Sequence, residues 1–471
     1  MIKFGTGGWR AVIGDGFTKE NIQKLSKGLA MKMRDEGVED KGIVIGYDRR
    51  FLSKEAMRWA GEVFAAEGIE AYLVNQSAPT PLIMYYVMSH EMPYGMMVTA
   101  SHNPAIYNGI KVFTSGGRDA DELQTQEIEN YIAEAVEKDV IGMDYDKAKA
   151  RGLIYEINPL NEYIDNILSS VDSQAIRSKG LRIALDPMYG VSETALKTIL
   201  LTARCTVYTI HDRHDTLFGG KLPSPSATTL KSLQNYVIDH NLDLGIATDG
   251  DADRIGVIDD TGKFLHPNDI LVLLYYYLVK HKGWSGAAVR NIATTHLLDK
   301  VAESFNEKCY EVPVGFKHIS AKMDETNAVI GGESSGGMAV RGHIKGKDGV
   351  YAATLLVEMV AVMGKKLSEI MNDIWDEYGY YYMSEKDYRF NIEKKNWIFQ
   401  KIIIDKLLPD LPLEVIKISY LDGCKIYFQN GGWIVIRFSG TEPLLRIFCE
   451  MPREEEVGLV CQIFEEFLGL S

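Results

Sequence analysis

One pattern recurs three times along the chain and limits the folds that it can adopt. In each copy an apolar segment with strand character precedes a helical pattern and then a second apolar strand. A strand, a helix and a strand at this spacing form a β–α–β unit, in which the helix covers one face of a sheet. The three copies therefore predict three related α/β domains. The segments are expected at residues 43–48, 53–67 and 71–74, then at 181–186, 192–201 and 206–210, and then at 287–289, 296–305 and 309–313.

The chain after Tyr388 alternates strand and helix patterns and ends in an amphipathic helix at 454–468, which predicts a smaller α+β domain. The charged and weakly periodic stretch 138–151 is expected to be a linker. The fold class is therefore α/β, with three related domains of mixed sheets followed by a C-terminal α+β domain. The expected boundaries are 1–145, 146–258, 259–375 and 376–471.

Charge and composition exclude several classes of partner. The net charge of −14 argues against nucleic acid and anionic membranes, because both select cationic surfaces. The longest apolar run, 270–279, is too short to span a bilayer and predicts a buried helix. Five scattered cysteines without a C-x-x-C pair indicate a reducing compartment, and the first ten residues carry no apolar signal-peptide segment. We expect a cytoplasmic protein that is a monomer or a homodimer.

The segment 98–104 reads V-T-A-S-H-N-P and presents a hydroxyl, Ser101, beside an imidazole, His102. It follows the apolar residues 96–98 and ends at Asn103-Pro104, which is a strong turn signal. A serine on a turn after a core strand is a candidate nucleophile held on a rigid base. The alternative is an ordinary strand exit, in which the serine and asparagine bond only to local backbone.

A second loop, T-D-G-D-A-D-R at 248–254, places Asp249, Asp251 and Asp253 at alternate positions after an apolar stretch. Three adjacent carboxylates repel each other without a cation, and Mg²⁺ prefers such oxygen ligands. An EF-hand is excluded because its sixth and twelfth positions would be Arg254 and Asp260 instead of glycine and glutamate. A solvated acidic turn and a phosphatase loop with an aspartyl nucleophile remain alternatives.

A third loop, G-G-E-S-S-G-G at 331–337, surrounds one acid and two hydroxyls with glycines. It matches the G-x-S-x-G nucleophile elbow, but no Asp or Glu lies between Ser334 and the next histidine, His343, so the hydrolase triad order fails. A loop that reads the hydroxyls of a sugar or polyol fits better, with a flexible surface loop as the alternative.

The fourth loop, I-R-F-S-G-T-E-P at 436–443, follows a predicted strand at 433–438. Consecutive backbone N–H groups, the hydroxyls of Ser439 and Thr441, and the Arg437 guanidinium suit a phosphate. A hairpin turn with a solvated arginine is the alternative. No Walker A sequence and no zinc spacing occurs, so nothing in the chain calls for ATP or zinc.

The four loops together combine a serine nucleophile, a Mg²⁺ site, a hydroxyl-reading loop and a phosphate site. This is the equipment for phosphoryl transfer on a phosphorylated polyol without a nucleotide. Cationic side chains that suit an anionic substrate occur near the loops, at Arg10, Lys111, Arg254, Lys317 and Arg437.

These motifs resemble the α-D-phosphohexomutase family of phosphoglucomutases and phosphomannomutases. T-A-S-H-N-P, D-G-D-A-D-R, G-E-S-S-G and R-F-S-G-T-E-P occur in the family's order, after F-G-T-G-G-W-R at residues 4–10. The resemblance covers nearly the whole chain and implies four domains around a central cleft. It also implies a hexose phosphate substrate, Mg²⁺ as cofactor and glucose 1,6-bisphosphate as activator.

The resemblance implies a role for each matching residue. Ser101 would be the phosphoserine, and its phosphate would hold Mg²⁺ together with Asp249, Asp251 and Asp253. Glu333 and Ser335 would read sugar hydroxyls, and the substrate's non-reacting phosphate would bind at Arg437, Ser439, Gly440 and Thr441. Active-site polar groups would be Arg10, His102, Lys111, Arg254 and Lys317. Either His102 or Lys111 would move the hydroxyl proton.

Two departures from the family pattern limit what the resemblance implies. Gly337 stands where some bacterial members have histidine, so a role for that histidine does not carry over. Ser334 stands where glucosamine-phosphate mutases have glutamine, which argues against glucosamine phosphate. We expect glucose phosphate first and mannose phosphate second, with glucosamine or pentose phosphate as the nearest alternative. A Mg²⁺ phosphatase with Asp251 as nucleophile and a non-enzymatic sugar-phosphate sensor are the more distant alternatives.

Overall fold

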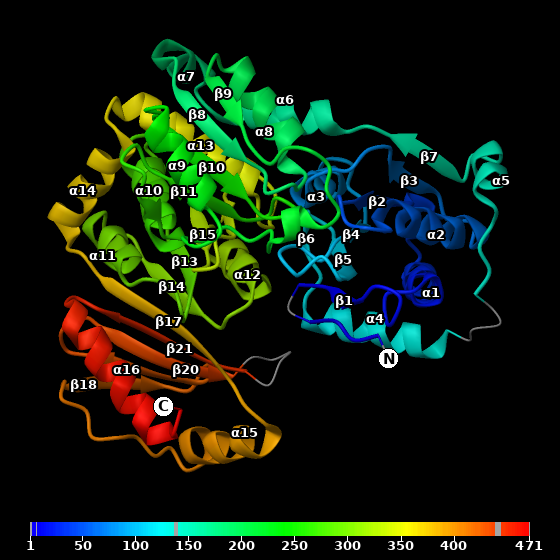
Figure 1. Ribbon diagram of the computed structural model, residues 1–471. Helices are drawn as coiled ribbons and strands as arrows, with labels where there is room; N and C mark the ends of the chain where they lie inside the picture. The colour runs from blue at the N-terminus through cyan, green and yellow to red at the C-terminus, as the bar shows by residue number, and fades with distance from the viewer. Residues whose placement is uncertain (1, 6, 136–139, 439–443, 471) are drawn as a thin grey trace. The chain divides into compact units, whose positions relative to one another are not determined.

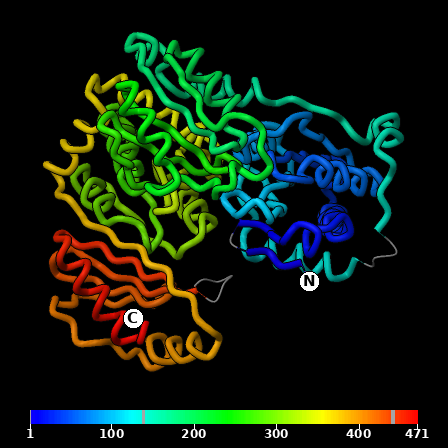
Figure 2. Tube along the Cα trace, in the orientation of Figure 1, coloured from blue at the N-terminus to red at the C-terminus, as the bar shows by residue number. Residues whose placement is uncertain are grey.

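The computed structural model describes residues 2–5, 7–135, 140–438 and 444–470 (Figure 1). The chain forms two compact units, which are described separately. The first comprises residues 1–270 and 335–370, and the second comprises residues 271–334 and 371–471. In Figure 2 the first unit therefore runs from blue into green and returns as a short yellow segment.

The first unit begins with a seven-stranded mixed sheet, to which five helices are connected along the chain. The neighbours β4, β2, β3 and β7 run parallel, whereas β1, β5 and β6 pair antiparallel. The strands are β1 (Trp9–Val12), β5 (Tyr107–Thr114), β4 (Tyr94–Val98), β2 (Ile43–Tyr47), β3 (Ala71–Val74) and β7 (Ile154–Ile157), with β6 (Arg118–Asp119) beside β5. The helices are α1 (Lys19–Asp35), α2 (Ser53–Ala66), α3 (Thr80–Ser89), α4 (Glu122–Glu134) and α5 (Tyr145–Ala150).

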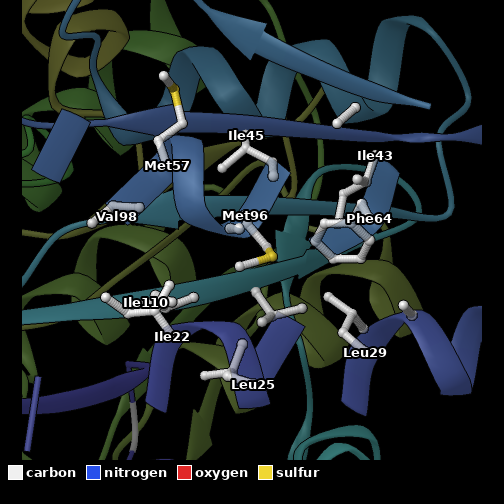
Figure 3. Close-up of a cluster of buried hydrophobic side chains, with 14 of the residues drawn as sticks. Ile22, Leu25, Leu29, Ile43, Ile45, Met57, Phe64, Met96, Val98 and Ile110 are labelled. Carbon is white, nitrogen blue, oxygen red and sulfur yellow. The ribbon is translucent and has the colours of Figure 1, made fainter. Parts of the chain in front are cut away.

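This sheet is buried on both faces, which explains why β2 and β4 read as unbroken apolar runs instead of alternating patterns. Figure 3 shows one face, where side chains of α1 such as Leu25 point toward Met96 and Ile110 of the strands. On the other face α3 packs so closely that a Cβ at Gly46 would lie 2.4 Å from Ile83 Cδ1. Parallel strands covered by helices on both sides give the rigid base on which the serine turn is built.

The expected linker is partly regular. Residues 145–150 form α5, because the Asp144 carboxylate accepts a hydrogen bond from Lys147 N (3.1 Å) and caps the helix, while Ala148 is buried. The chain then adds β7 in parallel to β3. A six-residue helix with one buried position produces too weak a periodicity to be recognised in the sequence.

The rest of the first unit contains the second sheet, in which β8, β9 and β10 run parallel and β11 and β12 are antiparallel. Helix α13 packs against α7, α8 and both β10 and β11. The strands are β12 (Phe264–Leu265), β11 (Ile255–Ile258), β10 (Leu244–Thr248), β8 (Arg182–Asp186) and β9 (Thr206–Thr209), with β16 (Met338–Val340) in the returning segment. The helices are α6 (Leu160–Ser170), α7 (Ser173–Lys179), α8 (Ser192–Thr202), α9 (Lys231–Asp239) and α13 (Gly349–Met363).

Two further helices, α10 (Pro267–Lys280) and α14 (Leu367–Tyr378), carry the chain between the units. The predicted buried helix at 270–279 is thus confirmed as part of α10, where residues such as Leu273 and Leu274 have no exposed surface. None of the described helices is long and apolar enough to cross a membrane.

The second unit contains the third α/β sheet, in which β13 pairs in parallel with β14 on one side and β15 on the other. Its elements are β13 (Ala288–Asn291), α11 (Leu297–Ser304), β14 (Cys309–Val312), α12 (Phe316–Thr326) and β15 (Ile330–Gly332). The predicted order of strand, helix and strand is confirmed in all three domains, as β2–α2–β3, β8–α8–β9 and β13–α11–β14.

The internal repeat also positions three of the four loops. In each domain the first strand of the repeat has a second parallel neighbour on its other side, which is β4, β10 or β15. The serine turn follows β4, the aspartate loop follows β10 and the glycine-rich loop follows β15. Because the carboxyl ends of such strands are where α/β sheets present their ligand sites, the three loops occupy equivalent positions in three copies of one design.

The C-terminal domain, orange to red in Figure 2, is an antiparallel five-stranded sheet with α16 packed against β21. This confirms the α+β class expected for the region. Its strands, in order across the sheet, are β17 (Tyr382–Arg389), β21 (Leu444–Met451), β20 (Trp433–Phe438), β19 (Cys424–Phe428) and β18 (Val415–Ser419), and its helices are α15 (Ile392–Phe399) and α16 (Glu454–Leu468).

A buried lysine links this domain to the third α/β sheet within the second unit. Lys425 Nζ donates hydrogen bonds to Glu311 Oε2 (2.7 Å) and to the backbone oxygen of Ile292 (2.7 Å), and it lies 4.2 Å from the centre of the Trp433 ring. Burial, and then the positive charge of Arg290, lowers the pKa of Lys425 to about 7. Lys425 is 1% exposed in the folded state, and because its pKa is shifted there, its titration changes the free energy of unfolding.

We expect this lysine to make the protein more stable at pH 9 than at pH 7. In this window the unfolded chain, with a lysine pKa of about 10.4, binds a proton that the folded state releases, so rising pH favours folding. The contribution is about 2 kcal/mol between the two pH values. Urea unfolding of the wild type and Lys425→Met at both pH values should show a pH effect smaller by that amount in the variant, and an equal pH effect would contradict the shifted pKa.

Candidate active site

The Ser101 turn begins where β4 ends. Thr99 Oγ1 accepts a hydrogen bond from Ser101 N (2.9 Å), and Asn103 N donates to the backbone oxygen of Ala100 (3.0 Å). Ser101 adopts a left-handed conformation with φ of 51° and is 1% exposed. A non-glycine residue in this region is uncommon and often marks a functional position. The turn therefore holds the predicted nucleophile in a specific and buried conformation.

The aspartate loop joins β10 to β11 and wraps around its first carboxylate. Asp249 Oδ1 accepts hydrogen bonds from the backbone N–H groups of Asp253 and Arg254, both at 3.1 Å. Ala252 has a φ of 62°, which turns the chain back toward Asp249. As a result Asp249, Asp251 and Asp253 are fully buried, and one oxygen of each lies within 4.8 Å of the others.

The serine turn and the aspartate loop meet in the first unit. Ser101 Oγ donates a hydrogen bond to Asp249 Oδ2 at 2.7 Å, and His102 Nδ1 lies 3.3 Å from the same Oγ. The approach requires Gly250, because a Cβ at that position would lie 2.7 Å from the Ser101 backbone oxygen. The structure thus brings together Ser101, His102 and the three aspartates.

Two lysines and a threonine bind Oδ2 of Asp251 and Asp253. Lys111, in β5, donates to Asp251 Oδ2 (2.7 Å) and Asp253 Oδ2 (2.6 Å). Lys347 Nζ lies 2.9 Å from the same oxygen of Asp253, and Thr80 Oγ1, in the first turn of α3, donates to Asp251 Oδ2 (2.6 Å). The loop is therefore fixed by side chains from several segments of the first unit.

The carboxylate oxygens that make no hydrogen bond suit a divalent cation. Asp251 Oδ1 and Asp253 Oδ1 are buried and have no hydrogen-bond partner among the described residues. Buried carboxylate oxygens without a partner are costly unless a cation compensates them. Hard oxygen donors from three carboxylates are the ligand set that Mg²⁺ prefers. The residues present fit a divalent metal ion.

The pKa shifts of the three aspartates also indicate that the loop needs additional positive charge. Burial, and then the charges of Asp251 and Asp253, raises the pKa of Asp249 well above its usual range. Burial acts in the same direction on Asp251 and Asp253, but their pKa values are lowered, by Lys111 and the Thr80 hydrogen bond at Asp251 and by Lys111, Lys347 and Arg254 at Asp253. The neighbouring cations therefore do not neutralise all three carboxylates, and a divalent ion would lower the pKa of Asp249 as well.

The predicted cations Arg10 and Arg254 contact the nucleophile turn and the aspartate loop, respectively. Arg10 Nη1 donates to Asn103 Oδ1 (2.7 Å), and Arg254 Nε lies 3.8 Å from Asp253 Oδ1. Burial, and then Arg254 and Arg10, lowers the pKa of His102 well below its ordinary value, so the imidazole is neutral at pH 7. Two guanidinium groups near Ser101 provide the positive charge that a phosphoryl group requires.

Gly336 of the third loop binds to the start of β11 in the first unit. Gly336 has a φ of 95°, and its backbone oxygen accepts a hydrogen bond from Ile255 N (3.1 Å) directly after the aspartate loop. Ser335 precedes this contact and is exposed. His343 is instead buried between Asn166 Oδ1 (3.1 Å) and Asp348 Oδ2 (2.8 Å), which indicates a structural role.

The remaining predicted residues lie in the second unit. Glu333 follows β15, and its Oε1 accepts hydrogen bonds from Asn291 Nδ2 and Gly315 N, both at 3.2 Å. Lys317 lies in the first turn of α12, two residues after Gly315. Arg437, at the end of β20, donates through Nε to Asp422 Oδ2 (2.9 Å). Ser439, Gly440 and Thr441 lie outside the described residues.

Sequence reasoning missed two residues that contact the aspartates, Thr80 and Lys347. Thr80 begins a helix after Pro79, which looks like an ordinary helix start. Lys347 is one of several basic residues in the segment 341–347 and has no distinctive spacing. Only the contact with Asp253 distinguishes it from its neighbours.

Comparisons with known proteins agree with this geometry. The chain matches the models of all four domains of phosphoglucomutase/phosphomannomutase: α/β/α domain I at residues 1–139, domain II at 161–262, domain III at 266–378 and the C-terminal domain at 408–466. These matches cover most of the chain and follow the family's domain order.

Individual relatives are similar over nearly their whole length. A phosphoglucomutase/phosphomannomutase of Thermococcus kodakarensis is 30% identical over 96% of this chain and 95% of its own. A phosphoglucosamine/phosphogalactosamine mutase of Sulfurisphaera tokodaii is 29% identical over 96% of this chain and 95% of its own. A crystal structure assigned as a phosphomannomutase of Thermus thermophilus has a TM-score of 0.86 and 27% identity, and covers 99% of both chains. The chain therefore belongs to the phosphoglucomutase/phosphomannomutase family, the α-D-phosphohexomutases.

Proposed function

We propose that this protein interconverts hexose 1-phosphate and hexose 6-phosphate, with glucose phosphate preferred and mannose phosphate second. The observation that carries the proposal is the 2.7 Å hydrogen bond from Ser101 Oγ to Asp249, at the edge of the aspartate triad. A nucleophilic hydroxyl, a divalent-cation site and a group of buried cations at one point are what phosphoryl transfer requires.

In the proposed cycle Ser101 carries a phosphoryl group and transfers it to the free hydroxyl of a hexose phosphate. The bond from Ser101 Oγ to phosphorus breaks as a bond from the sugar oxygen forms, which gives hexose 1,6-bisphosphate. The sugar hydroxyl loses one proton and Ser101 Oγ gains one. Transfer back to Ser101 from the other end of the bisphosphate releases the isomeric monophosphate. Glucose 1,6-bisphosphate would thus act as an activator that phosphorylates Ser101.

His102 is placed to move the proton on Ser101, because its Nδ1 lies 3.3 Å from Oγ. Lys111 is engaged by two carboxylates, so its role in the proposal is to balance their charge. Arg10 and Arg254 would hold the equatorial oxygens of the phosphoryl group. A Mg²⁺ ion bound by Asp249, Asp251, Asp253 and phosphorylated Ser101 would supply further neutralisation of the charge on that group.

The remaining predicted residues would recognise the part of the substrate that does not react. Glu333 is fixed by Asn291 and Gly315, so its carboxylate is oriented for hydrogen bonds from sugar hydroxyls. Ser335 and Lys317 would complete this contact. Arg437 would bind the second phosphate together with Ser439, Gly440 and Thr441.

A second candidate substrate is glucosamine phosphate. It is favoured by the 29% identity to the phosphoglucosamine/phosphogalactosamine mutase of Sulfurisphaera tokodaii over 96% of this chain. Against it, Ser334 replaces the glutamine expected between glutamate and serine in the sugar-reading loop. The two sugars differ only at the 2-position, where an amine replaces a hydroxyl, so direct comparison of substrates decides between them.

The test is turnover by ³¹P NMR with Mg²⁺ and a trace of the matching bisphosphate. Glucose, mannose and glucosamine 1-phosphate are compared at equal concentration, and the highest kcat/KM is expected for glucose. Peptide mapping should find about 80 Da of added mass on the Ser101 peptide, lost when a hexose monophosphate is added. A rate for glucosamine phosphate above that for glucose would reassign the substrate, and an unmodified Ser101 would contradict the mechanism.

A further inference from the structure

We propose that Arg50 is a positioning residue that holds the Ser101 turn in the conformation required for phosphoryl transfer. The proposal goes beyond the cycle above and rests on the proposed function of Ser101. Arg50 follows β2 and has a side chain with no exposed surface. It belongs to none of the four loops, and it does not contact the aspartate triad directly in any described hydrogen bond.

The Arg50 guanidinium donates to four backbone oxygens of one short segment. Nη2 bonds to the oxygens of Ser101 and Asn103, both at 2.7 Å. Nη1 bonds to the oxygens of Pro104 and Tyr107, both at 3.0 Å. One planar guanidinium thus binds backbone oxygens along the whole turn, from the nucleophile to the start of β5.

The turn needs such a partner because its carbonyl groups converge. The left-handed φ of Ser101 directs the chain away from the ladder of β4, so these oxygens cannot all pair within a sheet. Buried carbonyl groups without donors would be costly, and other backbone conformations would then compete with the observed one. The arginine therefore selects the conformation in which Ser101 Oγ reaches Asp249.

The backbone N–H of Ser101 is connected to Arg50 through Thr99 and Asp48. Asp48 Oδ1 accepts a hydrogen bond from Arg50 N (2.9 Å), and its Oδ2 accepts one from Thr99 Oγ1 (2.7 Å). Thr99 Oγ1 in turn accepts the hydrogen bond from Ser101 N. Both the N–H and the C=O of the nucleophile are thus connected to Asp48 and Arg50, which anchors them to the end of β2.

One face of the guanidinium is covered by an aromatic ring from the second α/β domain. The Phe218 ring centre lies 4.8 Å from Arg50 Cζ, and Phe218 is 1% exposed. The ring leaves the in-plane N–H groups directed at the backbone oxygens and excludes water from above. A lysine cannot reproduce this arrangement, because its ammonium has three donors and no plane.

The test compares Arg50→Lys with Arg49→Lys as a matched control. Arg49 is the preceding residue, but its guanidinium donates to the oxygen of Asp212 (2.7 Å), outside the serine turn. Arg50→Lys should lower kcat by about 10- to 100-fold with KM changed less than about twofold, because small displacements of a reacting group reduce the rate without removing substrate contacts. Arg49→Lys should retain wild-type kcat and KM.

Hydrogen–deuterium exchange supplies a readout that does not depend on activity. In Arg50→Lys the amides of 101–107 should exchange faster, while peptides of the distant sheet core keep wild-type protection. Unchanged kcat with unchanged exchange would overturn the proposal, as would a loss confined to KM or faster exchange throughout the first unit. If Arg50→Lys does not fold, Phe218→Leu is tested in its place. Wild-type kcat and wild-type exchange in Phe218→Leu would also overturn the proposal.

Failure of the proposed function gives a different result. In that case the wild type converts none of the hexose phosphates, while exchange at 101–107 still responds to Arg50→Lys. Failure of the positioning role leaves an active wild type and an Arg50→Lys variant with the same kcat.

Discussion

Replacing Ser101 with alanine should abolish hexose phosphate interconversion, with kcat at least about 10³-fold below the wild type. The hydroxyl is the proposed carrier of the phosphoryl group, and an alanine side chain leaves no acceptor at the position that contacts Asp249. The side chain is small and the backbone conformation is held by neighbours, so the fold should persist. Turnover is measured by ³¹P NMR, and folding by thermal unfolding.

Ser115→Ala is a suitable control for this variant. Ser115 follows β5 and is exposed, so the substitution should leave turnover and unfolding temperature unchanged. Release of inorganic phosphate is measured in parallel. A Ser101→Ala protein that still releases phosphate from a hexose phosphate would contradict the mutase cycle and favour a phosphatase with Asp251 as nucleophile.

Replacing Lys111 with methionine should destabilise the first unit strongly. The substitution keeps the length of the side chain but leaves Asp251 and Asp253 without the ammonium group that both contact. Removing one partner of a buried ion pair costs about 3–5 kcal/mol, because the remaining charge stays buried. Urea unfolding in the presence of EDTA should show a loss of this size, and a loss below about 1 kcal/mol would contradict the assigned role.

The same variant should respond more strongly to Mg²⁺. Loss of a positive charge beside two proposed ligands makes the site more negative, so the metal should bind the folded protein more tightly. Saturating Mg²⁺ should therefore raise the unfolding temperature of Lys111→Met by more than that of the wild type. Lys27→Met is the control, because Lys27 pairs with Glu67 away from the aspartates and should leave the Mg²⁺ effect unchanged.

The sequence predicted most of the secondary structure that carries the site. The helix at 454–468 and the strand at 433–438 agree with the structure at both ends, because a strong period and clear flanking residues mark them. The stretch 138–151 was harder to predict, since α5 is short and buries only Ala148. The domain boundaries and the roles of the site residues remain predictions.

The candidate site was predictable where chemistry is concentrated in consecutive residues. T-A-S-H-N-P and D-G-D-A-D-R contain Ser101, His102 and the three aspartates, which the structure brings into contact. Thr80, Lys347 and Arg50 could not be found in this way. None of them belongs to a recognisable motif, and their partners lie far away in the sequence or are backbone atoms.

By itself the sequence determined the three α/β repeats, the C-terminal domain and the loops that hold reactive groups. These follow from local periodicity and from the chemistry of neighbouring side chains. Only the tertiary structure decided that β4 and β10 present their loops to each other, that Lys111 and Lys347 share one carboxylate, and that Arg50 closes the serine turn. Such contacts depend on how sheets and helices pack, and no single segment contains the residues on both sides of them.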